Sequence, residues 1–343
     1  MNNFAIVGFI YNQPCPLKCD FCCHTKEVVG PGRLRPSNVI PIVLSFSRCP
    51  SVIRFAFTGG DPFLYIEEII EIMEQARRAD VKQPFHIVTS GYWATSEEAT
   101  SSVLGRLHEI GMDMLNVSYD KEHARFVPPE KILNISRACK SLGITLKLFG
   151  TFWNEGERVE DLLPALDGVE TQSRLVMPVG AARSHFIGRR YKQPDHVKYS
   201  CGAPRMYDLA IYPDGSAYPC CSGGFNREAK LQCGNVFTDS ASLVLDNAFG
   251  DFHVRIAKEI GFDKLYALVE QHRPDIFATL TPFNKVDSVC EICRDLHANA
   301  ELMGTLQEIY DELEIDYVTQ KLVHDWEKIL PKRRASLHLP VLG

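Results

Sequence analysis

The sequence lacks the features that would assign it at once to a membrane, secreted or repeat protein. It contains no apolar run of 18 residues, so no membrane-spanning helix is expected. Its first residues, MNNFAIVGFIYNQPCP, have neither the basic region nor the small-residue cleavage site of a secretory signal peptide. No internal repeat and no low-complexity tract is present, which favours an ordinary globular fold.

The chain also has no strong excess of charge of one sign. The chain has 37 Lys and Arg against 43 Asp and Glu, a formal net charge of −6, and no long basic run. This balance argues against nucleic acid or a membrane surface as a partner. The 343 residues, 45% hydrophobic and 23% charged, can bury a sizeable core. At about 150 residues per domain, they correspond to two domains or to one large α/β domain with an extension.

Cysteine, in contrast, is abundant. Twelve cysteines in a chain without a signal peptide indicate metal ligands or catalytic groups more than disulfides. Cys49 and Cys139 stand alone, and we expect both to be structural, with Cys139 a small buried apolar residue. The other ten form two groups: Cys15, Cys19, Cys22 and Cys23, and then Cys201, Cys220, Cys221, Cys233, Cys290 and Cys293.

Residues 4–178 alternate between short apolar runs and amphipathic helices, such as 66–78, whose apolar residues recur at spacings of three and four. Strands this apolar are covered on both faces, which indicates a parallel sheet. Right-handed crossovers then give a six-unit β/α barrel or an open sheet, with the ligand site at the carboxyl ends of the strands. The six strands are expected at residues 4–11, 52–58, 84–90, 113–119, 144–152 and 173–180.

The pattern changes after about residue 185. Two short strands are expected around a Pro213-Asp214-Gly215 turn, followed by several helices and a long amphipathic segment near 298–329. This predicts three parts: a barrel over 1–185, a small α+β domain over 186–300, and a C-terminal helix and tail over 301–343.

The first cysteine group has the spacing Cys15-x3-Cys19-x2-Cys22 on a loop directly after the first strand. Full ligation of a [4Fe–4S] cluster needs four cysteines, so three leave one iron open for a substrate or cofactor. A zinc site with a distant fourth ligand, to which His24 could contribute, is the alternative.

This loop resembles that of the radical S-adenosylmethionine (SAM) enzymes, including the aromatic Phe21 just before the last cysteine. The second strand ends in Thr58-Gly59-Gly60-Asp61-Pro62, which is similar to the GGEP segment of that family, with Asp61 in place of Glu. The resemblance implies a partial (β/α)6 TIM-like barrel, a SAM-binding [4Fe–4S] cluster held by Cys15, Cys19 and Cys22, and SAM itself. Physically, adjacent glycines permit a close backbone approach and positive φ.

The resemblance continues at later strand ends. Ser90 closes the third strand, Ser118-Tyr119-Asp120 the fourth, and Met177-Pro178-Val179-Gly180 the sixth. In that family such positions lie near SAM, which is cleaved to a 5′-deoxyadenosyl radical that removes hydrogen from an unactivated C–H bond. Asp120 could instead cap the following helix. The SAM-binding residues implied are Gly59, Gly60, Asp61, Ser90, Ser118 and Asp120.

The second cysteine group resembles the twitch domain, a shortened SPASM domain, of some radical SAM enzymes. The resemblance implies one auxiliary [4Fe–4S] cluster on Cys201, Cys220, Cys290 and Cys293. A fuller SPASM pattern would place a further cysteine at 299, where the chain has Asn299. Cys233 could replace one of the four ligands, and a zinc ribbon is the alternative.

Cys221 follows Cys220 directly, and both cannot easily bind the same cluster. A free thiol there could give a hydrogen atom to a carbon radical, and radical SAM peptide epimerases have a similar Cys-Cys pair. Other SPASM-type proteins have the pair as well. The leading hypothesis is therefore Cα epimerisation, from L to D, of a ribosomally made peptide, with Cys221 as the donor.

Two other hypotheses remain open. The same radical chemistry could form a thioether or carbon–carbon cross-link, or oxidise a small molecule. Alternatively, the chain could be a non-catalytic zinc scaffold, although that would leave the glycine-rich strand end without a purpose.

The enzyme hypotheses imply particular partners and surroundings. They require a peptide substrate, an electron donor such as flavodoxin or ferredoxin, and a reducing cytoplasm. Because the chain begins at the first strand, we expect either that recognition of a peptide leader comes from elsewhere or that the substrate is not a leader peptide. His24, His86 and His123 receive no role.

Overall fold

The computed structural model describes residues 3–30, 32–166, 168–186, 201–203, 205–221, 224–286 and 288–336. Their strands form one nine-stranded sheet in the order β6-β5-β4-β3-β2-β1-β7-β8-β9. The first six strands pair in parallel, as the sequence predicts. They are β1 (Phe4–Asn12), β2 (Val52–Gly59), β3 (Phe85–Thr89), β4 (Met112–Ser118), β5 (Thr145–Phe152) and β6 (Glu170–Leu175).

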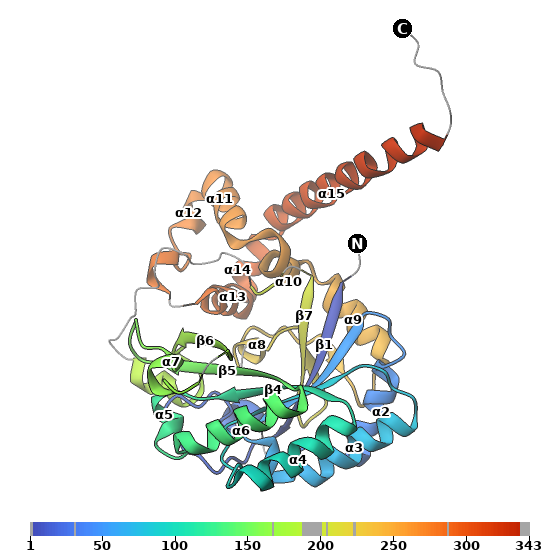
Figure 1. The fold of residues 1–343 in the computed structure, drawn as a ribbon. Coiled ribbons are helices and arrows are strands. Elements are labelled where there is room, and N and C mark those ends of the chain that lie inside the picture. Colours follow the sequence, from blue (N-terminus) through green and yellow to red (C-terminus); the bar gives the residue numbers. More distant parts are fainter. Residues whose placement is uncertain are drawn as a thin grey trace.

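Helices on one side of this sheet connect its strands (Figure 1). The predicted amphipathic pattern of residues 66–78 is confirmed, since its apolar residues are buried. Ser96 caps α4, because its side chain accepts a hydrogen bond from the amide of Ala99. The four helices are α2 (Pro36–Phe46), α3 (Ile66–Arg78), α4 (Glu97–Glu109) and α6 (Pro129–Leu142).

The main core lies between the strands and these helices. Phe9, Phe55, Phe57 and Phe85 are fully buried there and stack across three neighbouring strands, with ring centroids of Phe9 and Phe57 5.5 Å apart. Side chains alternate along a strand, so the opposite face carries a different set. On β4, for example, Asn116 and Ser118 are partly exposed.

Two predicted elements differ from the structure. The sixth strand is polar, spans Glu170–Leu175 and leaves alternate residues exposed, because it is an edge strand with β5 as its single neighbour. The amphipathic helix predicted between the fifth and sixth strands is one turn long, α7 (Val159–Leu162). Pro164 explains this early end, since the residue before a proline disfavours the helical conformation.

The predicted hairpin is present and extends the same sheet. β7 (Met206–Ile211) and β8 (Ser216–Tyr218) pair antiparallel around the turn, where Gly215 has φ +80°. β7 also pairs in parallel with β1, and β9 (Gly234–Asn235) follows β8. The sheet therefore continues across the boundary expected at residue 185. Among the described strands β6 does not pair with β9, so the sheet is open.

A second apolar cluster lies in the C-terminal helices and includes Ile256, Leu265, Ile292, Leu306 and Leu313. The long segment expected near 298–329 is divided between two helices, and the second extends away from the body of the molecule (Figure 1). These helices are α9 (Ala241–Gly250), α10 (Phe252–Arg255), the π-helix η3 (Ile256–Ile260), α11 (Phe262–His272), α12 (Pro274–Phe277), α13 (Val289–Ala298), α14 (Ala300–Thr305) and α15 (Gln307–Ser336).

The remaining elements are short: α1 (Lys26–Val29), η1 (Pro62–Tyr65), α5 (Lys121–Ala124), η2 (Gly180–Phe186), α8 (Phe225–Glu228) and η4 (Phe283–Lys285). Within the described part of the chain, no helix combines the length and the apolar character needed to cross a membrane.

Candidate active site

The first cysteine group lies on the loop between β1 and α1, at the carboxyl end of the sheet. The amide of Cys22 donates to the carbonyl of Cys19 at 3.1 Å, and the Sγ of Cys15 accepts from the amide of Leu17 at 3.4 Å. All three predicted ligands, Cys15, Cys19 and Cys22, are partly exposed. The loop therefore presents its thiols at the edge where the sequence predicts a ligand site.

Gly59 and Gly60 hold this loop against the end of β2. A Cβ on Gly60 would lie 2.0 Å from the carbonyl oxygen of Pro14, and one on Gly59 would lie 2.3 Å from that of Asn12. The Gly60 amide donates to the Asn12 carbonyl at 2.6 Å. The two glycines thus let the end of β2 approach the backbone of the cysteine loop closely, and this contact positions the loop.

Asp61 organises the neighbouring strand end. Its carboxylate is fully buried and accepts hydrogen bonds from the Ser90 amide and hydroxyl, at 2.8 and 2.7 Å, from the Thr89 hydroxyl, at 2.9 Å, and from the Phe63 amide, at 3.1 Å. Burial raises the pKa of Asp61, and these hydrogen bonds oppose that shift. Asp61 therefore links the ends of β2 and β3 and fixes the orientation of Ser90.

Asp120 does the same for β4 and β5. It caps α5 by accepting from the amides of Glu122 and His123, both at 3.0 Å, and it accepts from the Thr151 amide at 3.1 Å. The ring of His123 also contacts its carboxylate, with Nδ1 2.8 Å away. Ser118, two residues earlier, is partly exposed at the end of β4 and pairs with Phe149.

The segment that follows β6 closes over the cysteine loop. Gly180 has φ +52°, and a Cβ there would lie 2.3 Å from the carbonyl oxygen of Cys22. The Ala181 amide donates to the same oxygen at 2.9 Å. Phe21, which directly precedes Cys22, packs near His123, and their ring centroids are 6.0 Å apart. Direct contacts therefore join the cysteine loop, the ends of β2 to β5 and the segment after β6.

The thiols of this loop repel one another when ionised. Burial is the main reason that the pKa of Cys15 rises to about 11 and that of Cys22 to about 12. For Cys19, burial and then the charges of Asp120, Cys22 and Cys15 raise the pKa further. A bound cationic group would lower the pKa values of these thiols again, because metals bind the thiolate form.

Cys23 has a different environment. Burial alone would raise the pKa of its thiol, but the adjacent His24 outweighs that effect and lowers it to about 7. The same interaction raises the pKa of His24.

The second cysteine group converges from three parts of the chain. Cys201 is joined to η3 by a 2.5 Å hydrogen bond from its amide to the Ala257 carbonyl. Cys290 and Cys293 lie on one face of the first turns of α13, at a spacing of three residues. Burial and then the charges of Cys220, Cys290 and Cys201 raise the pKa of Cys293, which places the four thiols within electrostatic reach of one another.

Cys233 is oriented differently from these four. It is buried in the main core, and its Sγ donates to the carbonyl of Ala217 at 3.3 Å. Cys139 is buried in the same core, which confirms the prediction of a small apolar residue.

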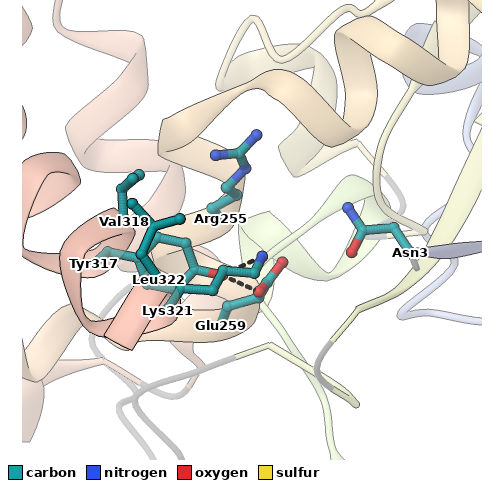
Figure 2. Close-up of a pocket in the computed structure, with 7 residues that line it drawn as sticks. All are labelled: Asn3, Arg255, Glu259, Tyr317, Val318, Lys321 and Leu322. Carbon is teal, nitrogen blue, oxygen red and sulfur yellow. Dashed lines mark hydrogen bonds between the residues drawn. The ribbon is translucent and has the colours of Figure 1, made fainter. Parts of the chain in front are cut away.

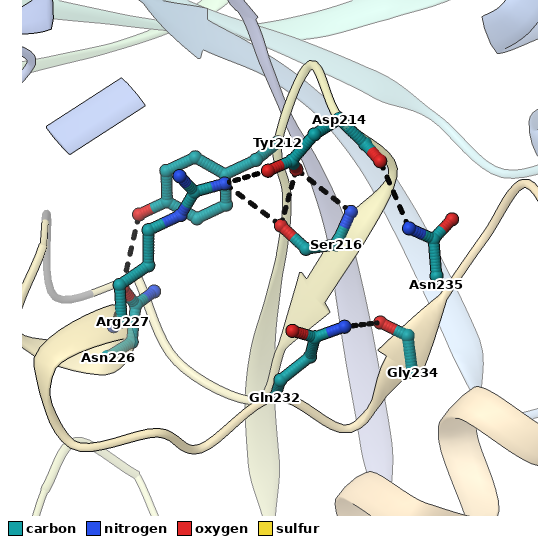
Figure 3. A network of polar contacts seen from close by, with 8 residues as sticks. All are labelled: Tyr212, Asp214, Ser216, Asn226, Arg227, Gln232, Gly234 and Asn235. Atoms are coloured by element: carbon teal, nitrogen blue, oxygen red, sulfur yellow. Dashed lines mark hydrogen bonds and ion pairs between the residues drawn. The ribbon is translucent and has the colours of Figure 1, made fainter. Parts of the chain in front are cut away.

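A polar network fixes the hairpin beside Cys220 (Figure 3). Arg227 donates to Asp214 at 2.7 Å and to the Ser216 hydroxyl at 2.9 Å, and its guanidinium lies 4.0 Å from the ring centroid of Tyr212. The neighbouring Asn226 accepts from the Tyr212 hydroxyl at 3.1 Å and donates to the Cys220 carbonyl at 3.0 Å. The turn and Cys220 are thus parts of one rigid unit.

Cys221 points to a carboxylate on β7. Its Sγ donates to Oδ2 of Asp208 at 3.7 Å, and its side chain is open to solvent. The surrounding protein still desolvates the thiol, and together with the Asp208 charge this raises its pKa well above the usual value.

A metal ion of the zinc type needs three or more side chains that converge on one point. Among the described residues no three His, Cys, Asp or Glu side chains do so. In an iron–sulfur cluster, by contrast, each cysteine binds a different iron, so the thiols surround a larger body.

Comparison with known proteins agrees with this geometry. Residues 10–163, from β1 to α7, match the family model of the radical SAM superfamily. This match makes residues 10–163 similar to a radical SAM domain. A relative in Bacillus subtilis (strain 168), YydG, is named as a putative peptide biosynthesis protein and is 25% identical over 307 residues, which cover 86% of this chain and 92% of YydG.

Solved structures of other proteins share the fold. The enzyme anSMEcpe with bound AdoMet superposes on 90% of this chain and 100% of its own, with a TM-score of 0.54 and 13% identity. BtrN in complex with AdoMet and 2-DOIA covers 76% of this chain and 89% of its own, with a TM-score of 0.50 and 15% identity. The superfamily implies SAM and a [4Fe–4S] cluster, and the loop of Cys15, Cys19 and Cys22 has the donors that such a cluster needs.

Sequence patterns did not single out several residues that shape this region. Asn12 donates to the carbonyls of Pro14 and Asp61, at 2.6 and 3.2 Å, and its buried Oδ1 has no partner in the described structure. Asn116, on β4 near Ser118, also has a buried Oδ1 without one. Asp208 faces Cys221. A polar residue within an apolar strand was the available signal for all three.

Proposed function

We propose that this radical SAM enzyme epimerises a ribosomally made peptide at Cα, from L to D, with Cys221 as the hydrogen donor. The observation that carries the proposal is the contact of Cys221 with Asp208. Cys221 lies beside the second cysteine group but is not one of its four proposed ligands. The peptide class is supported by YydG, which is named for peptide biosynthesis, and by anSMEcpe, whose structure was solved with a bound Kp18Cys peptide.

In this proposal the first loop binds the SAM cluster. Cys15, Cys19 and Cys22 hold three irons and leave the fourth for SAM. Gly59 and Gly60 keep the loop against β2, and Asp61 and Asp120 fix the strand ends that carry Ser90 and Ser118. Ser118 is the side chain best exposed to contact SAM, whereas the hydrogen bonds of Asp61 and Asp120 occupy their carboxylates.

The second group holds an auxiliary [4Fe–4S] cluster in a twitch-like unit over residues 186–300. Cys201, Cys220, Cys290 and Cys293 are its ligands. Cys233 is excluded because its thiol is directed to the Ala217 carbonyl in the main core. Cys290 lies at the start of α13, where the helix dipole favours a thiolate.

When bound, SAM and its cluster supply a 5′-deoxyadenosyl radical that takes the hydrogen atom from Cα of an L-residue. Cys221 then gives its thiol hydrogen to the opposite face of Cα. The C–H bond forms, the S–H bond breaks, and a thiyl radical remains on sulfur. One electron from a flavodoxin- or ferredoxin-type donor and one proton from solvent restore the thiol. Asp208 holds the S–H group in place for this transfer.

The test is turnover by the Cys221→Ala variant. Anaerobically reconstituted protein is incubated with dithionite, SAM and a peptide encoded beside its gene, and the product is hydrolysed for chiral amino-acid analysis. We expect the variant to keep forming 5′-deoxyadenosine while the D-residue disappears. Cys49→Ala is the matched control, because Cys49 lies outside both groups. An unchanged D-product with the same solvent label from the Cys221→Ala variant would refute the donor assignment.

A further inference from the structure

Lys258 is a buried cation beside the second cysteine group. It lies in the middle of η3, and 3% of its surface is exposed. Burying an ammonium group is costly unless it is compensated by charge or hydrogen bonds. A lysine in this state needs a counter-charge.

The position of Lys258 is well defined on the side of the cysteines. Its Nζ lies 5.8 Å from the ring centroid of Tyr207 on β7, and a Cβ on Gly202 would approach it to 3.6 Å. Gly202 follows Cys201 directly, and the Cys201 amide donates to the carbonyl of Ala257, the residue before Lys258. The ammonium group is therefore at the base of the segment that presents Cys201.

The backbone of η3 is anchored on its other side by α15. Glu259 accepts a hydrogen bond from the hydroxyl of Tyr317 and lies 3.8 Å from Nε of Arg205. Figure 2 shows the contact with Tyr317 in a pocket of about 290 Å³ between η3 and α15. Glu259 and Lys258 are neighbours, so the anchor fixes the segment that directs Lys258 inward. π-helical turns of this kind are often found at functional sites.

The charges around Lys258 come from the cysteines and Asp208. Burial would lower the pKa of Lys258, but the neighbouring Cys201, Asp208, Cys221 and Cys220 raise it overall.

We propose that Lys258 is a positioning charge that stabilises the reduced form of the auxiliary cluster and so raises its reduction potential. The inference rests on the proposed second cluster. One-electron reduction adds one negative charge to the cluster. A fixed cation nearby stabilises that charge more in a protein interior than in water. No step of the hydrogen transfer is assigned to Lys258.

The test is a potentiometric titration of the reconstituted protein, followed by electron paramagnetic resonance. Lys258→Met keeps the length of the side chain and removes its charge, Lys258→Arg restores the charge, and Lys264→Met removes an exposed lysine on α11. The SAM-binding cluster is distinguished because SAM changes its signal. For the auxiliary cluster we expect Lys258→Met to lower the potential by about 59 mV or more, a tenfold change in the one-electron equilibrium. Lys258→Arg and Lys264→Met should stay near the wild type.

Each outcome has a meaning. Loss of the auxiliary cluster in Lys258→Met with retention in Lys258→Arg also supports a required charge. Loss in both variants, or an unchanged or higher potential in Lys258→Met, overturns the role of Lys258 and leaves the proposed function intact. A wild-type protein with one cluster overturns the second cluster itself, and Lys258 with it.

Discussion

At the scale of the residue, the groups that shape the first site do so mainly by holding other groups. Asn12 and Asp61 connect the cysteine loop, β2 and β3 through hydrogen bonds that leave little freedom at any of them. Such positioning matters because the thiolates must surround a cluster, and a displaced loop cannot do so. Substitutions that move the loop are therefore expected to affect metal binding before they affect chemistry.

Gly60→Ala is expected to prevent assembly of the SAM-binding cluster. Its Cβ would lie 2.0 Å from the Pro14 carbonyl, which forces the cysteine loop away from β2. Iron analysis and Mössbauer spectra should show one of the two clusters lost. Gly105→Ala is the control: this α4 residue has open space around it, and alanine there should stabilise the helix by about 0.5–1 kcal/mol. Full iron content in Gly60→Ala would contradict the role given to this contact.

Asp208→Asn is expected to uncouple radical formation from product formation. The substitution weakens the hydrogen bond that orients the Cys221 thiol, because the acceptor loses its charge. The ratio of 5′-deoxyadenosine to D-residue should rise about tenfold, the effect of about 1.4 kcal/mol on the transfer step. A fall in both products together would indicate a structural role instead.

His86 makes the fold sensitive to acid. It is buried on β3, its Nδ1 has no partner among the described residues, and burial lowers its pKa from 6.5 to about 4. Between these values the unfolded chain binds a proton that the native protein does not, so stability is complete above pH 6.5 and falls as the pH drops toward 4. The loss attributable to His86 between about pH 7 and about pH 5 is about 2 kcal/mol.

Urea unfolding at both pH values measures this loss. In both His86→Gln and His86→Phe, the free energy of unfolding should fall less between the two pH values than it does in the wild type, by the loss attributed to His86. Parallel behaviour of wild type and both variants would show that His86 does not titrate in this way.

Residue types and spacing predicted more about the cysteines than about their surroundings. Cys15, Cys19 and Cys22 are recognisable because their ligand spacing is local in sequence. The contact of Cys221 with Asp208, and the burial of Lys258, depend on how β7, the hairpin and η3 meet, which no local pattern encodes. For Asp120 the sequence indicated two roles, at the SAM site or as a helix cap, because a carboxylate before a helix is a common cap.

At the scale of the element, the β7–β8 hairpin links the barrel sheet to the second cysteine group. Its turn is fixed by the ion pair and stacking of Arg227 rather than by a large core. Tyr212 and Asn226 pass this rigidity on to Cys220. The hairpin would thus have to be ordered for the proposed auxiliary cluster to bind.

Arg227→Leu is expected to loosen this element. It removes hydrogen bonds to Asp214 and Ser216 and the contact with the Tyr212 ring, and we expect a loss of about 2 kcal/mol and faster hydrogen exchange in β8. Arg183→Leu, which breaks a surface pair with Glu228 on α8, should cost less than about 1 kcal/mol and leave β8 exchange unchanged. Equal effects of both substitutions would argue against a special role for Arg227.

The parallel strands and their helices could be predicted because their periodicity reflects burial on one or two faces. The bounds of the sixth strand could not be predicted in this way, because an edge strand pairs with one neighbour and carries polar residues. Pairing of β7 with β1 is a long-range event between strands far apart in sequence, and neither strand signals its partner.

At the scale of the whole molecule, the sheet places the first cysteine loop and Asp208, the partner of Cys221, at opposite ends of neighbouring strands. Asp208 pairs with Ile6 near the start of β1, whereas the cysteine loop follows Asn12 at its end. A strand rises about 3.3 Å per residue, so about 20 Å separates these levels. A peptide between them would face the adenosyl radical from one side and the Cys221 thiol from the other, as inversion at Cα requires.

The mass of the peptide after turnover in deuterium oxide tests this arrangement most directly. Exchange loads the Cys221 thiol with deuterium, so inversion predicts a D-residue and a product in which one deuterium replaces one hydrogen at Cα of each inverted residue. A product lighter by two hydrogen atoms, with every residue still in the L form, would contradict the account and establish a cross-link or an oxidation.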